Sequence, residues 1–204
     1  MDSRYYEQIG SETVCIDEKL PFAIPNSWKW IRLSAIAEFV SGVSYQKQDI
    51  VHNGIRILRG GNIQDEAIVT NEDDVFLPRK YTDSKNEIKT GDVVIVASTG
   101  STIAIGRPGF AINNMPSVQI GAFLRIVRPY SEDMIMIIKT IFQSNYYRDS
   151  IRAAVKGTNI GNIKTEYITE LFVPIPPLAE QMRLMTVIEK LLATIQIGRT
   201  VNLH

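Results

Sequence analysis

Three short segments combine glycine with side chains that can donate hydrogen bonds to phosphates or base edges. They are RGGNIQ from Arg59, STGSTIAIGR from Ser98 to Arg107, and KGTNIGNIK from Lys156 to Lys164. Glycine lets a backbone approach a ligand closely, and Arg, Lys, Asn, Ser and Thr contact nucleic-acid backbones and bases. The same residue types also occur in ordinary turns. The pattern therefore predicts three recognition loops, with three surface turns as the alternative.

Signals for catalysis and for metal binding are weak. A thiol–imidazole pair would have to come from Cys15, the single cysteine, and His52; a small buried thiol and a loop imidazole are the simpler interpretation. One cysteine cannot build a disulfide framework or a cysteine zinc cluster. The segment GSTIAIGRP is not a phosphate loop, because Arg107-Pro108 stands where Lys followed by Ser or Thr is needed. The sequence predicts no catalytic residues and no bound metal.

Composition and charge narrow the class of protein. The 204 residues include 45% hydrophobic and 22% charged residues, which is ordinary for a globular protein with a core. The 22 basic and 22 acidic residues cancel, which argues against an indiscriminate nucleic-acid binder but not against a sequence reader. Basic residues predominate between 139 and 164, whereas NEDDV is acidic. Neither a hydrophobic run of transmembrane length nor a signal peptide is visible, so the expected location is the cytoplasm.

The elements that must position the loops follow from periodicity and from turn residues. Strands are expected at GIRILRGGNI, at Val93–Ala97 after the Gly91-Asp92 turn, and at SVQIGAFLRIVRP. A short helix is expected around Ser34 to Phe39, and a longer one after Ser131 that breaks near Ser144. The predicted fold is α/β (α+β): a twisted mixed β-sheet with flanking short helices and a long C-terminal coiled-coil-type helix.

The C-terminal segment FVPIPPLAEQMRLMTVIEKLLATIQI sets three prolines against a long helix. Its apolar residues form two stripes. The first has a heptad-like spacing and consists of Leu178, Met185, Ile188, Leu192 and Ile195; the second consists of Leu184, Val187 and Leu191. Either one stripe packs on the chain's own domain and the other on a partner helix, or the whole helix is buried in its own fold. The expected organisation is an arm at 1–19, a domain at 20–176 and the helix at 177–204.

Taken in order, five segments resemble the specificity subunit of type I restriction–modification enzymes. They are LPFAIPNSWKWIRLSAIAEFVSG, GIRILRGGNI, GDVVIVASTGS with IGRPG, KGTNIGNI and FVPIPPLAEQ. The resemblance runs from about Leu20 to the C-terminus and implies a target recognition domain followed by a helical spacer. It also implies a non-catalytic subunit without a cofactor of its own, on which methyltransferase subunits dock and supply the S-adenosylmethionine chemistry. The restriction subunit would join the complex through them.

The resemblance covers one recognition domain and one spacer helix, where the family usually has two of each. The chain is expected to be either a half-size subunit that forms a homodimer or the C-terminal half of a longer subunit, and the arm favours the second. The prolines would fix the angle at which the helix leaves the domain. Leu178 to Ile197 is 20 residues, roughly 30 Å of helix, or on the order of nine base pairs of unread DNA between half-sites.

The resemblance does not assign individual contacts, because the recognition loops vary within the family. By residue chemistry, the candidates for base edges are Arg59, Asn62, Asn159 and Asn162, and those for phosphate are Lys156, Lys164 and Arg107. The full set of candidate DNA-binding residues is Lys47, Arg59, Asn62, Ser98, Thr99, Ser101, Thr102, Arg107, Asn113, Asn114, Lys156, Thr158, Asn159, Asn162 and Lys164.

Two other functions compete with DNA recognition. The first is a protein–protein scaffold held together by the two-striped helix, with a domain that no longer reads DNA. The second is a self-contained DNA methyltransferase, for which the sequence shows neither a cofactor loop nor an Asn-Pro-Pro-Tyr-type motif.

Overall fold

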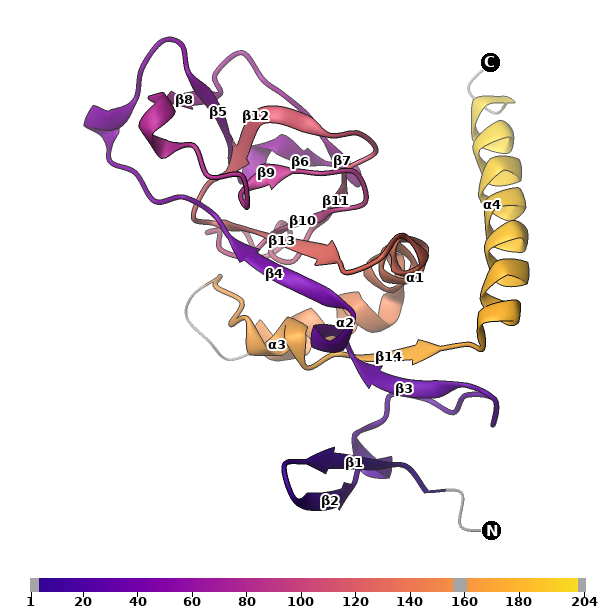
Figure 1. Cartoon of the computed structure of the whole chain (residues 1–204). Coiled ribbons are helices and arrows are strands. Elements are labelled where there is room, and N and C mark those ends of the chain that lie inside the picture. The colour runs from indigo at the N-terminus through magenta and orange to yellow at the C-terminus, as the bar shows by residue number, and fades with distance from the viewer. Residues whose placement is uncertain (1–3, 156–160, 202–204) are drawn as a thin grey trace. The chain divides into compact units, whose positions relative to one another are not determined.

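The computed structural model describes residues 4–155 and 161–201. These residues fall into two compact units: Arg32–Leu171, and a second unit that combines the residues before Arg32 with those after Leu171. Figure 1 shows the elements of both. Among the described helices, no segment combines the length and the hydrophobicity that a membrane span needs.

The Arg32–Leu171 unit contains two mixed sheets. The six-stranded sheet has the order β4-β13-β10-β11-β7-β6, and the four-stranded sheet has the order β8-β5-β12-β9. The strands of the first are β4 (Ala37–Ser41), β6 (Ile63–Gln64), β7 (Ala67–Ile68), β10 (Val93–Val96), β11 (Pro108–Phe110) and β13 (Leu124–Pro129). Those of the second are β5 (Ile55–Leu58), β8 (Val75–Leu77), β9 (Glu87–Ile88) and β12 (Met115–Ile120). The pairs β11–β7 and β12–β5 are parallel, and the others are antiparallel.

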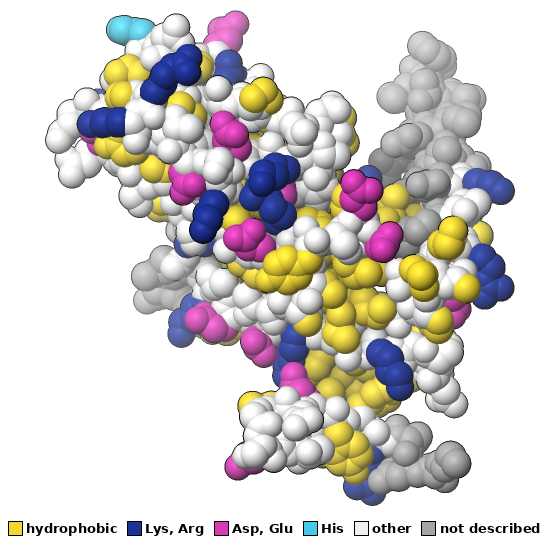
Figure 2. All heavy atoms as spheres, viewed as in Figure 1, with side chains coloured by type: hydrophobic (Ala, Val, Ile, Leu, Met, Phe, Trp, Pro, Cys, Tyr) yellow, Lys and Arg dark blue, Asp and Glu magenta, His cyan; other side chains and the backbone are white. Residues whose placement is uncertain are grey.

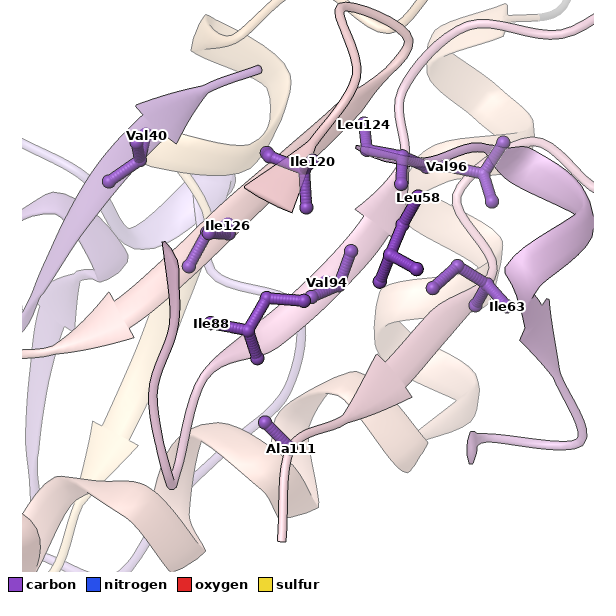
Figure 3. Packing of buried hydrophobic residues seen from close by; sticks show 10 residues of the cluster. All are labelled: Val40, Leu58, Ile63, Ile88, Val94, Val96, Ala111, Ile120, Leu124 and Ile126. Atoms are coloured by element: carbon purple, nitrogen blue, oxygen red, sulfur yellow. The ribbon is translucent and has the colours of Figure 1, made fainter. Parts of the chain in front are cut away.

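The main core lies between these two sheets. Leu58 and Ile120 from the four-stranded sheet pack with Val94, Val96 and Ile126 from the six-stranded sheet (Figure 3). All five side chains are 0% exposed, so the cluster supplies much of the hydrophobic driving force of this unit.

Helices cover the other face of the six-stranded sheet. All four residues of β10 are buried, and since side chains alternate along a strand, Val93 and Ile95 point away from the main core. On that side, α1 (Glu132–Gln143) packs against β13 and β11, and α2 (Asn145–Val155) packs on α1. The short α3 (Glu166–Thr169) in turn contacts α2. The unit is therefore layered as sheet, sheet and helices.

A single serine explains the predicted break between α1 and α2. The Ser144 hydroxyl donates to the Ile141 carbonyl at 2.6 Å and accepts from the Tyr147 N–H at 3.2 Å. It thus closes one helix and opens the next, which is the local competition with helix continuation expected of serine. The helix after Ser131, the break and strand β10 are confirmed.

The second unit contains a hairpin, a strand pair and the last helix. Its elements are β1 (Tyr6–Ile9), β2 (Glu12–Cys15), β3 (Lys29–Arg32), β14 (Phe172–Ile175) and α4 (Leu178–Val201). The expected arm at 1–19 thus contains the β1–β2 hairpin, whose turn has Gly10 at φ +63°. The domain boundaries expected from the sequence stay a prediction.

The prolines lead directly into α4. Pro174 lies in β14, which pairs only with β3 among the described strands, so its missing N–H is tolerated as on an edge strand. The N–H groups of Glu180 and Gln181 donate to the Pro177 carbonyl at 2.8 and 3.0 Å. The buried side-chain amide of Gln181 donates to the Pro176 carbonyl at 2.8 Å. The first helical turn is therefore tied back to the proline pair.

The helix expected around Ser34 to Phe39 is wrong. A 3-10 turn at Leu33–Ala35 is followed by strand β4, in which Phe39 stands opposite Val127 and Val40 opposite Ile126. Pairing along the length of β13 outweighs the weak local helix preference of this segment. The remainder of the expected fold, a mixed α+β unit with twisted sheets and few helices, is confirmed (Figure 1). Coiled-coil pairing of α4 stays a prediction.

Candidate nucleic-acid interface

The three predicted recognition loops come together after the C-terminal end of β10. The Thr99 N–H donates to the Gly161 carbonyl, and the Ile163 N–H donates to the Ala97 carbonyl, both at 2.7 Å. The Arg107 guanidinium donates through Nη2 to the Gly60 carbonyl at 3.2 Å. Segments about 40 to 60 residues apart in sequence thus form one surface, which we call the loop cluster: residues 59–62, 98–107 and 161–164.

Gly161 is required where the 98–107 loop and the 161–164 segment meet. A Cβ at Gly161 would collide with the backbone carbonyl oxygen of Thr99, whereas a Cβ at Gly100 would meet nothing within 4 Å. Alanine at 161 can be accommodated only by moving the two backbones apart.

Gly161→Ala is therefore expected to break the hydrogen bonds that join the two loops. The local cost should be about 1–3 kcal/mol, which should raise the amide exchange rates of Thr99 and Ile163 by about fivefold or more. Hydrogen exchange followed by NMR measures this directly. Gly100→Ala is the control, and unchanged exchange at Thr99 in the Gly161 variant would contradict the prediction.

The base of the 98–107 loop is held by hydrogen bonds, and its tip is exposed. The Gly106 N–H donates to the Val96 carbonyl at 2.8 Å, and the buried Tyr147 hydroxyl donates to the Gly106 carbonyl at 2.7 Å. Burial raises the pKa of Tyr147 far above its ordinary value, so the phenol keeps the proton that it donates. Ser98 and Thr99 are half-buried, whereas Ser101 and Thr102 are exposed and available to a ligand.

Asn62 is not available for a base edge, which corrects one of the sequence candidates. It is 1% exposed, and its amide nitrogen donates to Asp74 Oδ1 at 2.6 Å and to the Val69 carbonyl at 3.0 Å. Its Oδ1 accepts from the Arg59 N–H at 2.7 Å. These hydrogen bonds stabilise the 59–62 turn. If Asn62 turned to a base instead, its buried partners would lose their hydrogen bonds.

Arg59 is on the surface of the same turn. Its side chain is 42% exposed, and Nη2 donates to the Asp73 carbonyl at 2.8 Å and to Asp73 Oδ2 at 3.0 Å. An exposed ion pair of this kind contributes little energy, so the guanidinium can exchange it for a ligand. Asn162 and Lys164 are also exposed, in the third segment of the cluster.

The other sequence candidates lie elsewhere. Asn114 accepts through Oδ1 from the Thr90 N–H at 2.9 Å, which places it and its neighbour Asn113 at the end of β10 opposite to the loop cluster. Lys47 is exposed in a separate 3-10 turn with Asp49. Hydrogen bonds from the Gln46 N–H and from Tyr81 lower the pKa of Asp49, which stays charged and holds that turn. Lys156, Thr158 and Asn159 lie outside the described residues.

The surface charge is mixed rather than uniformly basic. On the face seen in Figure 2, Lys and Arg side chains lie among Asp and Glu side chains. Several arginines are paired internally, including Arg128 with Asp92 at 2.7 Å and Arg56 with Asp74 at 2.8 Å. Such a surface favours recognition by placed donors over recognition by bulk charge. No three His, Cys, Asp or Glu side chains of the described part could together hold a metal ion.

One residue at the cluster was not predicted from the sequence. Phe123 is 64% exposed, and its carbonyl accepts from the N–H groups of Ala97 and Ser98 at 2.9 and 3.1 Å. In the sequence it falls inside the expected strand SVQIGAFLRIVRP, where a phenylalanine is normally assigned to the core, and the only local signal was Gly121 two residues before it.

The predicted helix stripes are described in part. Leu178 is 63% exposed and Ile188 is half-buried, while the side chains of Met185, Leu192 and Ile195 lie outside those described. In the second stripe Leu184 is half-buried, and Val187 and Leu191 are 52% and 58% exposed. A helix buried all round in its own fold is therefore wrong, because apolar side chains on its described part face solvent. The partner that would cover them stays a prediction.

The chain is similar in sequence to specificity subunits of type I restriction enzymes. No model of a protein family matches the chain. Two curated relatives are the specificity subunits of the type I restriction enzymes EcoKI from Escherichia coli (strain K12) and StySPI from Salmonella potsdam. Each is 30% identical over 177 residues, which is 84% of this chain and 38% of the relative. The chain thus spans about two fifths of the length of the relatives that it matches.

A solved structure has a fold similar to that of this chain. The crystal structure of the HsdS subunit from Thermoanaerobacter tengcongensis superimposes with a TM-score of 0.63 at 18% identity, over 87% of this chain and 40% of that one. The similarity in fold and the similarity in sequence agree. Over most of its length the chain is a homologue of type I restriction enzyme specificity subunits, and it corresponds to about two fifths of such a subunit.

Proposed function

We propose that this chain is a sequence-specific DNA-binding module of a type I restriction–modification system, which reads one half of a split target. The observation that carries the proposal is the convergence of the three donor-rich loops on one surface, held by backbone hydrogen bonds between Thr99 and Gly161 and between Ile163 and Ala97. Positioned donors on a rigid frame are what reading base edges requires.

The roles within the cluster follow from exposure and chemistry. Arg59 and Asn162 are the candidates for base edges, and Lys164 and Arg107 those for phosphates. The exposed hydroxyls of Ser101 and Thr102 suit either target. In this proposal the chain itself catalyses nothing and works in the cytoplasm. Methyltransferase subunits supply S-adenosylmethionine chemistry, the restriction subunit joins through them, and α4 holds a second recognition domain at a set distance, either another copy or the other half of a longer subunit.

Salt dependence of duplex binding tests the phosphate contacts. We expect the chain to bind double-stranded DNA with an affinity that falls as salt rises, because each phosphate contact releases counterions. Lys164→Ala should weaken binding to all sequences and make the slope of log affinity against log salt less negative by about one. Fluorescence anisotropy with a labelled duplex pool measures both quantities.

Lys89→Ala is the matched control for that experiment. Lys89 is exposed too, but it precedes β10 and lies at the end opposite to the loop cluster. Equal slopes for the two variants would remove Lys164 from the interface. If the parent chain shows no duplex affinity at low salt but associates through α4, the alternative of a helix-mediated scaffold without DNA readout is the better function.

A further inference from the structure

A hollow of about 380 Å³ opens next to the loop cluster. Its volume lies within the range of about 300–1,000 Å³ that is usual for sites of small organic groups. Its lining includes Val43, Tyr45, Leu58, Arg59, Gly121 and Phe123. The lining thus combines two aromatic residues, a buried leucine and one arginine.

The walls of the hollow are fixed by backbone contacts. The Leu124 N–H donates to the Gly121 carbonyl at 2.9 Å, and the Phe123 carbonyl holds the N–H groups at the start of the 98–107 loop. On the facing segment, the Val43 N–H donates to the Ile120 carbonyl at 2.9 Å, and a Cβ at Gly42 would collide with the backbone of Gly121. The Phe123 ring is therefore presented by a turn that cannot easily withdraw it into the core.

The Phe123 side chain is exposed at the rim of the hollow. Phe123 leaves 64% of its surface in water although its neighbour Leu124 is 0% exposed. A rigid aromatic ring loses little side-chain entropy on binding, which is why such residues serve as anchors in recognition surfaces. Arg59 lines the same hollow, and the ion pair of its guanidinium with Asp73 is exposed and exchangeable.

We propose that this hollow is a nucleobase site, in which one unstacked base of bound DNA lies against the Phe123 ring beside the Arg59 guanidinium. The inference rests on the proposed function and extends it, because it adds an aromatic contact to the polar ones. Aromatic rings accept the face of any base, and the guanidinium adds a donor fork for its edge. Continuity with the loop cluster, through Arg59 and the Phe123 carbonyl, makes a base the occupant.

The test uses duplexes that already carry an unstacked base. Two 30-bp duplexes of one sequence are compared, one fully paired and one with a single unpaired 2-aminopurine, since an unpaired base has less stacking to lose. We expect the parent chain to bind the second duplex about tenfold more tightly and to quench its fluorescence. Phe123→Ala should bind both duplexes equally and leave the fluorescence unquenched, and Phe123→Trp should restore preference and quenching.

Tyr130→Ala is the matched control, because Tyr130 is an aromatic residue of similar exposure, 65%, beyond the opposite end of β13. It should keep both the preference and the quenching. Equal binding of the two duplexes by the parent chain, or a preference that survives Phe123→Ala, overturns the nucleobase site while leaving the proposed function intact. A parent chain that binds neither duplex overturns both.

Discussion

Asp92→Ala is expected to lower the free energy of unfolding of the Arg32–Leu171 unit by about 3–5 kcal/mol. Asp92 is 1% exposed and binds Arg128 at both carboxylate oxygens, with Nε–Oδ1 at 2.9 Å and Nη2–Oδ2 at 2.7 Å. It also accepts from the Lys89 N–H at 2.8 Å. Without Asp92 the Arg128 guanidinium, 12% exposed, stays buried with an uncompensated charge.

The geometry explains why this pair matters for the fold. Arg128 lies on β13, and its guanidinium also donates to the Lys85 carbonyl at 3.0 Å and to the Glu87 carbonyl at 2.7 Å. It therefore links the six-stranded sheet to the segment that leads into β9 of the other sheet. Urea unfolding followed by circular dichroism measures the loss.

The control for Asp92→Ala is a substitution in a solvent-exposed Asp–Arg pair of the same chain. Asp149 pairs with Arg152 at 3.1 Å, with side chains that are 69% and 77% exposed. Asp149→Ala should change the stability by less than about 1 kcal/mol, because exposed pairs are screened and cost side-chain entropy. Similar losses in the two variants would show that burial of the Asp92–Arg128 pair is not what sets its strength.

Asp74→Ala is expected to destabilise the same unit by roughly 3 kcal/mol and to disorder the 59–62 turn. The Asp74 side chain is 0% exposed and accepts from three donors: Arg56 Nη1 at 2.8 Å, Asn62 Nδ2 at 2.6 Å and the Asn71 N–H at 2.9 Å. Its removal leaves a buried amide, a backbone donor and a guanidinium without that acceptor. We therefore expect a loss of DNA affinity together with the loss of stability.

Asp73 provides a control one residue away. Its carboxylate is 80% exposed and contacts Arg59 at 3.0 Å. Asp73→Ala should cost less than about 1 kcal/mol, and DNA affinity should be unchanged or higher, since a negative charge next to Arg59 is removed. Unfolding curves and anisotropy on both variants separate the two effects. An Asp74 variant as stable as the Asp73 variant would contradict the role of the network.

Local signals in the sequence were sufficient for the elements that depend on neighbours along the chain. The run Val93–Val96 is buried on both faces, and the serine at 144 stops one helix and starts another, so each could be predicted from a short window. The prolines before α4 and the nature of the three loops were readable for the same reason. The chemistry of those loops could be predicted because Gly, Asn, Ser and Arg keep their donors wherever they are placed.

The burial and the hydrogen-bond partners of individual side chains were decided only by the tertiary structure. Asn62 and Arg59 belong to one turn, but Asp74, 12 residues beyond Asn62, buries the amide, while Asp73 leaves the guanidinium at the surface. Asn114 has the same chemistry as Asn162 and lies at the other end of β10. Residues 34–39 form a turn and a strand because β13, far along the chain, offers them a partner.

The sequence by itself thus determined the kind of fold, the positions of the long central strands and of the helices after Ser131, and the three segments able to meet a nucleic acid. Only the tertiary structure decided that these segments share one surface, that Asn62 supports it from within, and that Phe123 stands exposed beside it. The physical reason is that propensity, periodicity and donor chemistry act over a few residues. Burial and hydrogen-bond pairing are instead set by groups such as Gly161 and Thr99, which the chain brings together only on folding.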